Sequence, residues 1–364
     1  MNKILLTIVA ALMTAVCAKA QKIHVVDTNG IGIPMVSVLG EDGTFIGTTD
    51  LDGVLSDVKG AGEVTLTHVA YKSKKVKVGQ GDRILLDDAD FDIPEIVVTK
   101  KPLVYVQTYY RIFYMNEDPD DACCYYRTGV LDNSYVRETK KVSIDEDHFS
   151  TASMGFMKTI LNTFLGPFVN RFAGLKTEKV EKRIKDAYKE LDVELVPDGP
   201  GKQLIKDKYG VVGSVADYQE KGERRYSYEH QKLNHHLTQA TGSEKKIAKA
   251  EKREERQKNR KDQDFIVYRI DEQGNYAPED FVMSQNFTSY DEEKNGRTSS
   301  INILMQTFTV DRSYVTKEEL KQIKKENKMK MTYENILEFE RRNKIPALPE
   351  VFQKRIDEMV KKDK

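Results

Sequence analysis

Hydrophobic and polar residues alternate in short runs over residues 22–99, and residues typical of turns separate these runs. In EVTLTHVAY, residues 63–71, every second side chain falls on the same side, which is the pattern of a half-buried strand. Similar short runs occur at KIHVVD, MVSVLG, TFIGTT, VLSDV, KKVKV and RILL. Strands of this length and spacing predict a small antiparallel β-sandwich over residues 21–100.

The stretch GTTDLDGVLSDV, residues 47–58, has two interpretations, a calcium loop or a tight turn. An EF-hand loop with its glycine at Gly53 requires a carboxylate at position 48 and a glutamate at position 59. The chain has Thr48 and Lys59 there. Aspartate and glycine are the residues that tight reversals favour, so the sequence predicts a turn between two strands.

The sequence of this region also resembles a known family. The stretches VVDTNGIGIPMVSVLGEDGTFIGTTDLDGVLSDV, LTHVAYKSKKVKV and DIPEIVVTKK are similar to the carboxypeptidase-regulatory-like, transthyretin-like domain. This domain often stands at the periplasmic N-terminus of TonB-dependent outer-membrane receptors. The resemblance implies a non-catalytic module with no active-site residue. Too few residues follow position 100 for a plug and a large barrel, so the chain is more similar to the shorter exported proteins that carry this module.

Residues 1–20, MNKILLTIVAALMTAVCAKA, have the composition of an export signal. A lysine precedes an apolar run that is too short to span a bilayer, and Ala18-Lys19-Ala20 matches a cleavage site. We expect cleavage after Ala20, with lipid attachment at Cys17 as the alternative. The remaining cysteines, Cys123 and Cys124, are adjacent, which disfavours a disulfide between them and predicts two unpaired thiols.

Residues 101–315 predict an α+β domain, so that the chain as a whole is mainly β with α+β character. Residues 103–150 are rich in β-branched and aromatic residues and predict strands, with tyrosines over the sheet and their hydroxyls in water. A tyrosine platform for stacking a ligand is the alternative. Residues 154–172 space apolar residues as a helix does, which predicts packing against the sheet. If the helix is instead exposed, it would face a partner or a membrane surface through Met157, Leu161, Phe164 and Phe168.

Residues 173–262 are strongly charged and predict a helical insertion. Residues 244–261 are basic, and a solvated helix with paired charges is the interpretation we prefer over binding to anionic lipid head groups or an acidic partner. Residues 316–364 predict a helical C-terminal tail that begins at a capping box on Thr316 and is broken into two pieces by Pro346 and Pro349.

Candidate chemistry is sparse. The chain has no net charge, and export disfavours nucleic acid as a partner. Motifs of a nucleophile elbow, a zinc helix or a phosphate loop are missing from the sequence. His230, His235 and His236 form the one histidine cluster, and their spacing places no two on the same face of a helix. We therefore assign no catalytic, cofactor-binding or metal-binding residue and expect no cofactor.

These observations favour an exported, non-catalytic protein in the periplasm or on the outer membrane of a Gram-negative cell. It would act as an accessory protein of an outer-membrane complex or carry an apolar or extended ligand. One alternative is an envelope hydrolase with the β-sandwich appended, which requires a pocket that holds a histidine beside a carboxylate and a nucleophile. A purely structural envelope protein is the other alternative.

Overall fold

The computed structural model describes residues 21–58, 62–79, 82–117, 123–154, 169, 173–294, 296–327 and 332–363. It confirms a mainly β protein with several antiparallel sheets and with helices. The described chain divides into two units. The first holds residues 21–67 and 72–88, and the second holds residues 68–71 and 89–363.

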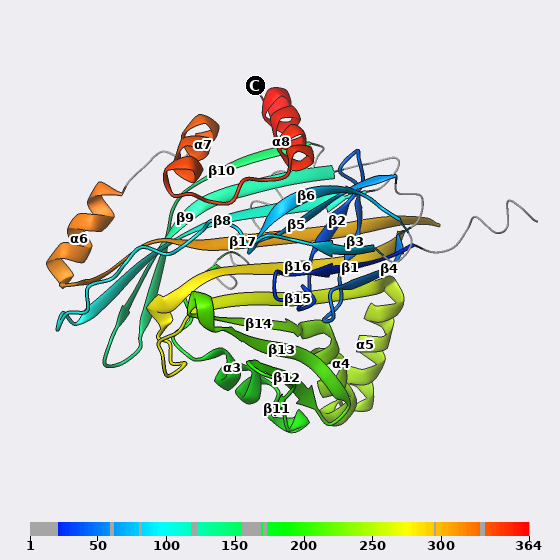
Figure 1. Ribbon diagram of the computed structural model, residues 1–364, viewed down its shortest axis with the longest axis horizontal. Coiled ribbons are helices and arrows are strands. Elements are labelled where there is room, and N and C mark those ends of the chain that lie inside the picture. Colours follow the sequence, from blue (N-terminus) through cyan, green and yellow to red (C-terminus); the bar gives the residue numbers. More distant parts are fainter. Residues whose placement is uncertain are drawn as a thin grey trace, which may run out of the picture. The chain divides into compact units, whose positions relative to one another are not determined.

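Two sheets form the first unit (Figure 1). One has the strand order β4-β1-β7 and the other β3-β2-β5-β6. The parallel pairing of β1 with β7 corrects the prediction of purely antiparallel strands. EVTLTHVAY is two strands rather than one, because the chain reverses at Val69 and Ala70. The strands are β1 (Gln21–Val26), β2 (Ser37–Leu39), β3 (Phe45–Thr48), β4 (Val54–Val58), β5 (Glu63–His68), β6 (Tyr71–Lys77) and β7 (Asp82–Leu85).

The turn predicted between β3 and β4 is confirmed. The Asp50 carboxylate accepts hydrogen bonds from the backbone N–H groups of Asp52 and Val54, at 3.0 and 2.9 Å. Gly53 has a φ of +76°, a conformation that residues with a Cβ rarely adopt. Both hydrogen bonds to Asp50 lie within the loop itself, as in a tight turn.

One antiparallel sheet of ten strands forms most of the second unit. Its strand order is β10-β9-β8-β17-β16-β15-β14-β13-β12-β11, so the strand that follows β10 along the chain lies at the far edge. The strands are β8 (Leu103–Asn116), β9 (Cys123–Val136), β10 (Val142–Met154), β11 (Glu194–Pro197), β12 (Lys202–Asp207), β13 (Gly210–Tyr218), β14 (Glu223–Glu229), β15 (Gln257–Arg269), β16 (Phe281–Lys294) and β17 (Arg297–Val315).

Helices cover both faces of this sheet. The described helices are α3 (Val180–Ala187), α4 (His230–Thr241), α5 (Glu244–Arg256), α6 (Lys317–Glu326), α7 (Tyr333–Arg342) and α8 (Glu350–Asp363), with short 3-10 turns at Lys189–Leu191, Gln219–Lys221 and Pro278–Asp280. Figure 1 shows α3 and α4 beside β11–β15, and α7 and α8 beside β9 and β10. Among the described residues, no helix combines the length and the apolar character that crossing a membrane requires.

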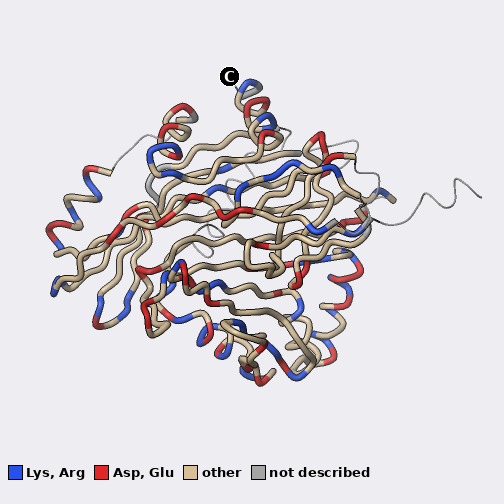
Figure 2. Tube along the Cα trace, in the orientation of Figure 1, with Lys and Arg blue, Asp and Glu red and all other residues tan. Residues whose placement is uncertain are grey.

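Residues 173–262 are not a purely helical insertion. They contain β11–β14, and β15 begins inside them at Gln257. The strands were not predicted, because one face of each carries Lys, Arg, Glu or Asp and these charged residues resemble the surface of a solvated helix. Figure 2 shows acidic and basic residues alternating along α5, as expected for a solvated helix. The C-terminal tail begins at the predicted capping box between Thr316 and Glu319, but it forms three helices rather than two.

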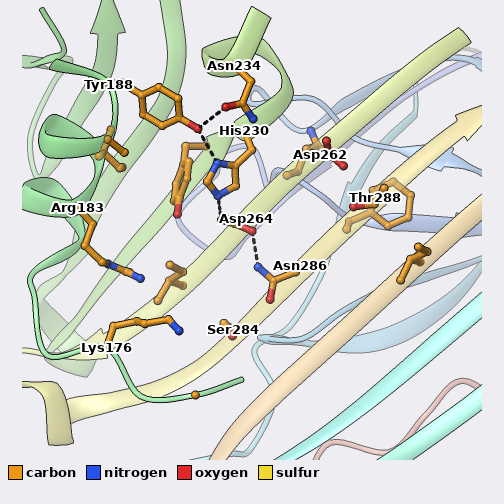
Figure 3. A pocket seen from close by; sticks show the side chains of 18 of the residues that line it. Lys176, Arg183, Tyr188, His230, Asn234, Asp262, Asp264, Ser284, Asn286 and Thr288 are labelled. Carbon is orange, nitrogen blue, oxygen red and sulfur yellow. Dashed lines mark hydrogen bonds and ion pairs between the residues drawn. The ribbon is translucent and has the colours of Figure 1, made fainter. Parts of the chain in front are cut away.

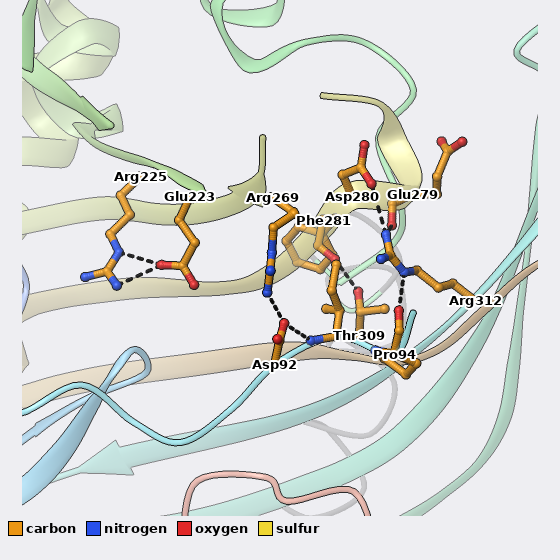
Figure 4. A network of polar contacts seen from close by, with 11 residues as sticks. Asp92, Pro94, Glu223, Arg225, Arg269, Glu279, Asp280, Phe281, Thr309 and Arg312 are labelled. Atoms are coloured by element: carbon orange, nitrogen blue, oxygen red, sulfur yellow. Dashed lines mark hydrogen bonds and ion pairs between the residues drawn. The ribbon is translucent and has the colours of Figure 1, made fainter. Parts of the chain in front are cut away.

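Arginines anchor the segment that leads into the sheet (Figure 4). The Arg312 guanidinium donates to the carbonyl oxygens of Pro94 and Glu279, at 2.7 and 2.9 Å, and pairs with Asp280 at 3.0 Å. Arg269 pairs with Asp92. These contacts fix residues 92–94, although the segment contains no regular secondary structure.

Candidate functional site

A cavity of about 640 Å³ lies between α3, α4 and the sheet of the second unit (Figure 3). Alternate side chains of β14, β15 and β16 face it, because successive residues of a strand point to opposite sides of a sheet. The register places Tyr228 opposite Asp264, and Asp264 opposite Asn286. The volume of the cavity lies within the range of about 300–1,000 Å³ that is usual for small-molecule sites.

Apolar and aromatic side chains supply much of the cavity wall. Several of them also belong to the hydrophobic core beneath α3 and α4, so the wall is anchored by the packing of the fold. The apolar and aromatic lining residues are Leu175, Ile184, Tyr188, Tyr228, Ile266, Tyr268, Phe281, Phe287 and Ile303.

A chain of hydrogen bonds crosses the polar end of the cavity. His230, the first residue of α4, places Nε2 at 2.5 Å from Oδ2 of Asp264 and Nδ1 at 3.1 Å from the Tyr188 hydroxyl. That hydroxyl donates to Oδ1 of Asn234 at 3.1 Å. Asn286 donates to the other oxygen of Asp264. Figure 3 shows these groups in one continuous network.

Both ring nitrogens of His230 are engaged. Nδ1 lies 3.1 Å from the Tyr188 hydroxyl, which also donates to Asn234, and Nε2 lies 2.5 Å from the carboxylate of Asp264. A general base needs a ring nitrogen within reach of the proton that it removes, and in this arrangement both nitrogens already have partners.

Burial acts to raise the pKa of Asp264, but His230 and the hydrogen bonds from Asn286 and Tyr228 outweigh it and lower the pKa on balance. Burial also raises the pKa of Tyr228 far above its usual value, and the nearby charge of Asp264 raises it further. The carboxylate is thus held ionised and the phenol neutral. Neither group is poised for proton transfer near neutral pH.

The other two predicted histidines bind separate carboxylates. Nδ1 of His235 lies 2.8 Å from Glu254, and Nδ1 of His236 lies 2.6 Å from Asp207. The helix α4 therefore directs its three histidines toward three different acidic groups. The described residues include no group of three His, Cys, Asp or Glu side chains that could hold a metal ion.

The candidate partner-facing residues Met157, Leu161, Phe164 and Phe168 lie outside the described residues, as do residues 1–20. Cys124 is a free, buried thiol, and burial is the main reason that its pKa is raised.

The tyrosines between 105 and 135 differ from the prediction. Tyr105, Tyr109 and Tyr135 are buried, and their hydroxyls donate to the carboxylates of Asp132, Glu340 and Glu279. They are structural residues of the sheet and not a platform for a ligand.

Sequence reasoning missed Asp264, Tyr188, Asn234 and Arg183, all of which line the cavity. The available signal was the alternation in β15, where Asp262, Asp264 and Ile266 share one face. The predicted helical insertion extends to residue 262, which separates Asp262 from the strand that holds Asp264 and Ile266.

Comparisons with known proteins add little. No protein-family model matches the chain, and no curated protein is similar to it in sequence. Among solved structures, lipovitellin, from a study of its lipid–protein interactions, matches 60% of this chain at 8% identity with a TM-score of 0.30. The match spans 26% of the lipovitellin chain.

A second solved structure, the MucA/MucB complex of Pseudomonas aeruginosa, matches 54% of this chain and 88% of its own at 7% identity, with a TM-score of 0.11. Neither TM-score indicates a shared fold, so neither likeness contributes to the functional argument.

Proposed function

We propose that this chain is an exported, non-catalytic envelope protein whose second unit binds a small, largely apolar ligand in the cavity between α3, α4 and the sheet. The observation that carries the proposal is the combination of an aromatic and aliphatic wall with a polar end whose histidine is fully engaged. A cavity of this kind selects a ligand by shape and polarity.

The first unit supports the envelope setting. Its two sheets and the Asp50–Gly53 turn are compatible with the transthyretin-like β-sandwich that the sequence resembles. Together with the signal-like residues 1–20, this resemblance favours the periplasm or the outer membrane of a Gram-negative cell. It also favours a role as an accessory protein of an outer-membrane complex.

An envelope hydrolase is the competing function, and one observation favours it. Ser284, His230 and Asp264 line the same cavity. However, a serine hydrolase needs a neutral histidine with a free nitrogen beside the serine. Both nitrogens of His230 are used by Asp264 and Tyr188, so the binding function fits the geometry better.

Ligand occupancy tests the binding function. The protein purified from the envelope of its own cells is analysed by native mass spectrometry, and the bound small molecule is extracted and identified. The variant Ala187→Trp places a large ring at the cavity wall. Lys189→Trp, at an exposed position just beyond the same helix, is the matched control. Occupancy lost in Ala187→Trp and kept in Lys189→Trp supports the proposal; occupancy unchanged in both contradicts it.

Chemical cross-linking in intact cells tests the accessory role separately. A reproducible outer-membrane partner that is lost when residues of one sheet edge are changed supports this role. Recovery of the protein alone contradicts it under that growth condition and leaves the ligand-binding function intact.

A further inference from the structure

Arg183 in α3 directs its guanidinium into the cavity. Figure 3 shows the charged ends of Arg183 and Lys176 pointing the same way, toward the strands that carry Asp264 and Asn286. Nε of Arg183 is buried and has no hydrogen-bond partner. A buried donor that lacks an acceptor is costly, so this position has a reason to receive one.

The acidic groups of the cavity do not supply that acceptor. Asp262 receives two hydrogen bonds from Arg260, at 2.8 and 2.9 Å, and Asp264 is held by His230 and Asn286. The buried Nε of Arg183 is left without an acceptor among the described residues. The acidic side chains that line the cavity are thus neutralised by other groups, and the charge of Arg183 remains available.

Basic groups outnumber acidic groups around the cavity. The basic lining residues are Lys176, Arg183, His230, Arg253 and Arg260, and the acidic ones are Asp262 and Asp264. An excess of positive charge in a partly enclosed space attracts anions and disfavours cations. The wall close to Arg183 is apolar, because Ile184 is its neighbour in α3 and Tyr268 lies across the cavity.

We infer that the ligand is an anionic amphiphile whose carboxylate or phosphate head binds the Arg183 guanidinium and whose tail lies along the apolar wall. This inference rests on the proposed ligand-binding function and names the chemical class of the ligand. A guanidinium suits such a head because its planar donors match two oxygens of a carboxylate or a phosphate at once. The tail would contact Leu175, Ile184, Ile266, Tyr268 and Phe281, which line the cavity.

The experiment uses four probes with the same saturated tail and different heads: dodecanoate, dodecyl phosphate, dodecanol and dodecyltrimethylammonium. Binding to the purified protein is measured by isothermal titration calorimetry below the concentration at which each probe self-associates. We expect the anionic probes to bind at least about tenfold more tightly than dodecanol, because charge-assisted hydrogen bonds to Arg183 add that much to the affinity. Dodecyltrimethylammonium should bind most weakly. The ratio of the two anionic probes distinguishes a carboxylate ligand from a phosphate ligand.

Variants at position 183 locate the effect. Arg183→Gln should abolish the preference for anionic probes and leave dodecanol binding within about twofold of the original protein, because only the charge-assisted bonds are lost. Arg183→Lys should restore part of the preference. Lys185→Gln removes one exposed positive charge from the same helix and is the matched control, with the preference retained. Thermal unfolding of each variant shows that it is folded.

The outcomes separate this inference from the proposed function. Equal binding of dodecanol and both anions, unchanged in Arg183→Gln, overturns the anionic head group and keeps the apolar cavity as a binding site. A preference for anions that survives Arg183→Gln but is lost in Lys185→Gln overturns the role of Arg183. Binding of none of the probes contradicts the proposed function itself.

Discussion

Nε2 of His230 lies 2.5 Å from Oδ2 of Asp264, and this contact joins the first residue of α4 to the middle of β15. The carboxylate is nearly buried, with 7% of its side chain exposed, whereas the imidazole is about a third exposed. The pair closes the polar end of the cavity and fixes where α4 begins relative to the sheet. The contact therefore stabilises the site.

Replacing His230 should destabilise the second unit. His230→Ala leaves the Asp264 carboxylate buried with its main opposite charge removed, which we expect to lower the free energy of unfolding by about 2 kcal/mol, less than a fully buried pair would lose. Urea unfolding measures the loss. His235→Ala, which removes an exposed pair with Glu254 from the same helix, should change it by less than about 0.5 kcal/mol.

The effect of His230→Ala on the free energy of unfolding should depend on pH. Asp264 has a lowered pKa in the folded protein, so it contributes stability above its unfolded pKa, about 3.9, and this is lost as the pH falls through the folded value. Without His230, burial dominates and the pKa of Asp264 should rise. Protonation of Asp264 then relieves the cost of burying its charge in the variant. The difference in unfolding free energy between the original protein and His230→Ala should therefore become smaller as the pH is lowered from about 6 to about 4. A constant difference would contradict this account.

His68 predicts a second, separate pH window. Burial, and secondarily the charge of Arg225, lowers its pKa from 6.5 to about 3. The backbone N–H of Ala70 donates to Nδ1 of this neutral ring at 3.2 Å. Because the unfolded chain binds the proton more readily, stability should fall as the pH drops below 6.5, by at most about 1.4 kcal/mol per pH unit.

The check on His68 is urea unfolding at about pH 7 and about pH 5.5, the two sides of the unfolded-state pKa. His68→Asn has no titrating ring, so its unfolding free energy should change less between these two values. An equal pH dependence in both proteins would show that His68 is not the group responsible.

Glu340 should anchor α7 to the sheet. Its carboxylate lies 3.4 Å from the nearly buried Arg111 guanidinium and accepts a hydrogen bond from the Tyr109 hydroxyl at 2.6 Å. Glu340→Ala leaves this arginine without its carboxylate, and we expect a loss of about 2–4 kcal/mol. Hydrogen exchange should show faster exchange in α7. The control Glu338→Ala changes an exposed residue of the same helix and should have almost no effect.

Gly53 should be indispensable to the turn in the first unit. A Cβ at this position would lie 2.3 Å from the carbonyl oxygen of Val25, besides occupying a left-handed conformation. Gly53→Ala should therefore cost more than the conformational effect alone, which is about 1 kcal/mol. Gly62→Ala has only one neighbour, at 3.7 Å, and is the control. Limited proteolysis of residues 21–88 compares the two variants, and equal resistance would contradict the prediction.

Strands with a clear period of two were predictable from the sequence. Residues 103–150 were predicted to form strands from their β-branched and aromatic residues, and the structure places β8, β9 and β10 there. The cap at Thr316 was predictable for the same reason, because a capping box depends on neighbours only three residues apart. The strands within residues 194–229 were not predicted, because charged residues on their faces obscured the alternation of polar and apolar positions.

The sequence by itself determined the mainly β character, the Asp50–Gly53 turn and the start of α6, because these depend on contacts between residues close in the chain. Only the tertiary structure decided the cavity. Its groups come from α3, α4, β15 and β16, and pairing distant strands brings His230, Asp264 and Asn286 together. The unpaired Nε of Arg183 could not be predicted from the sequence either, since the surrounding carboxylates that already bind other groups are known only from the tertiary structure.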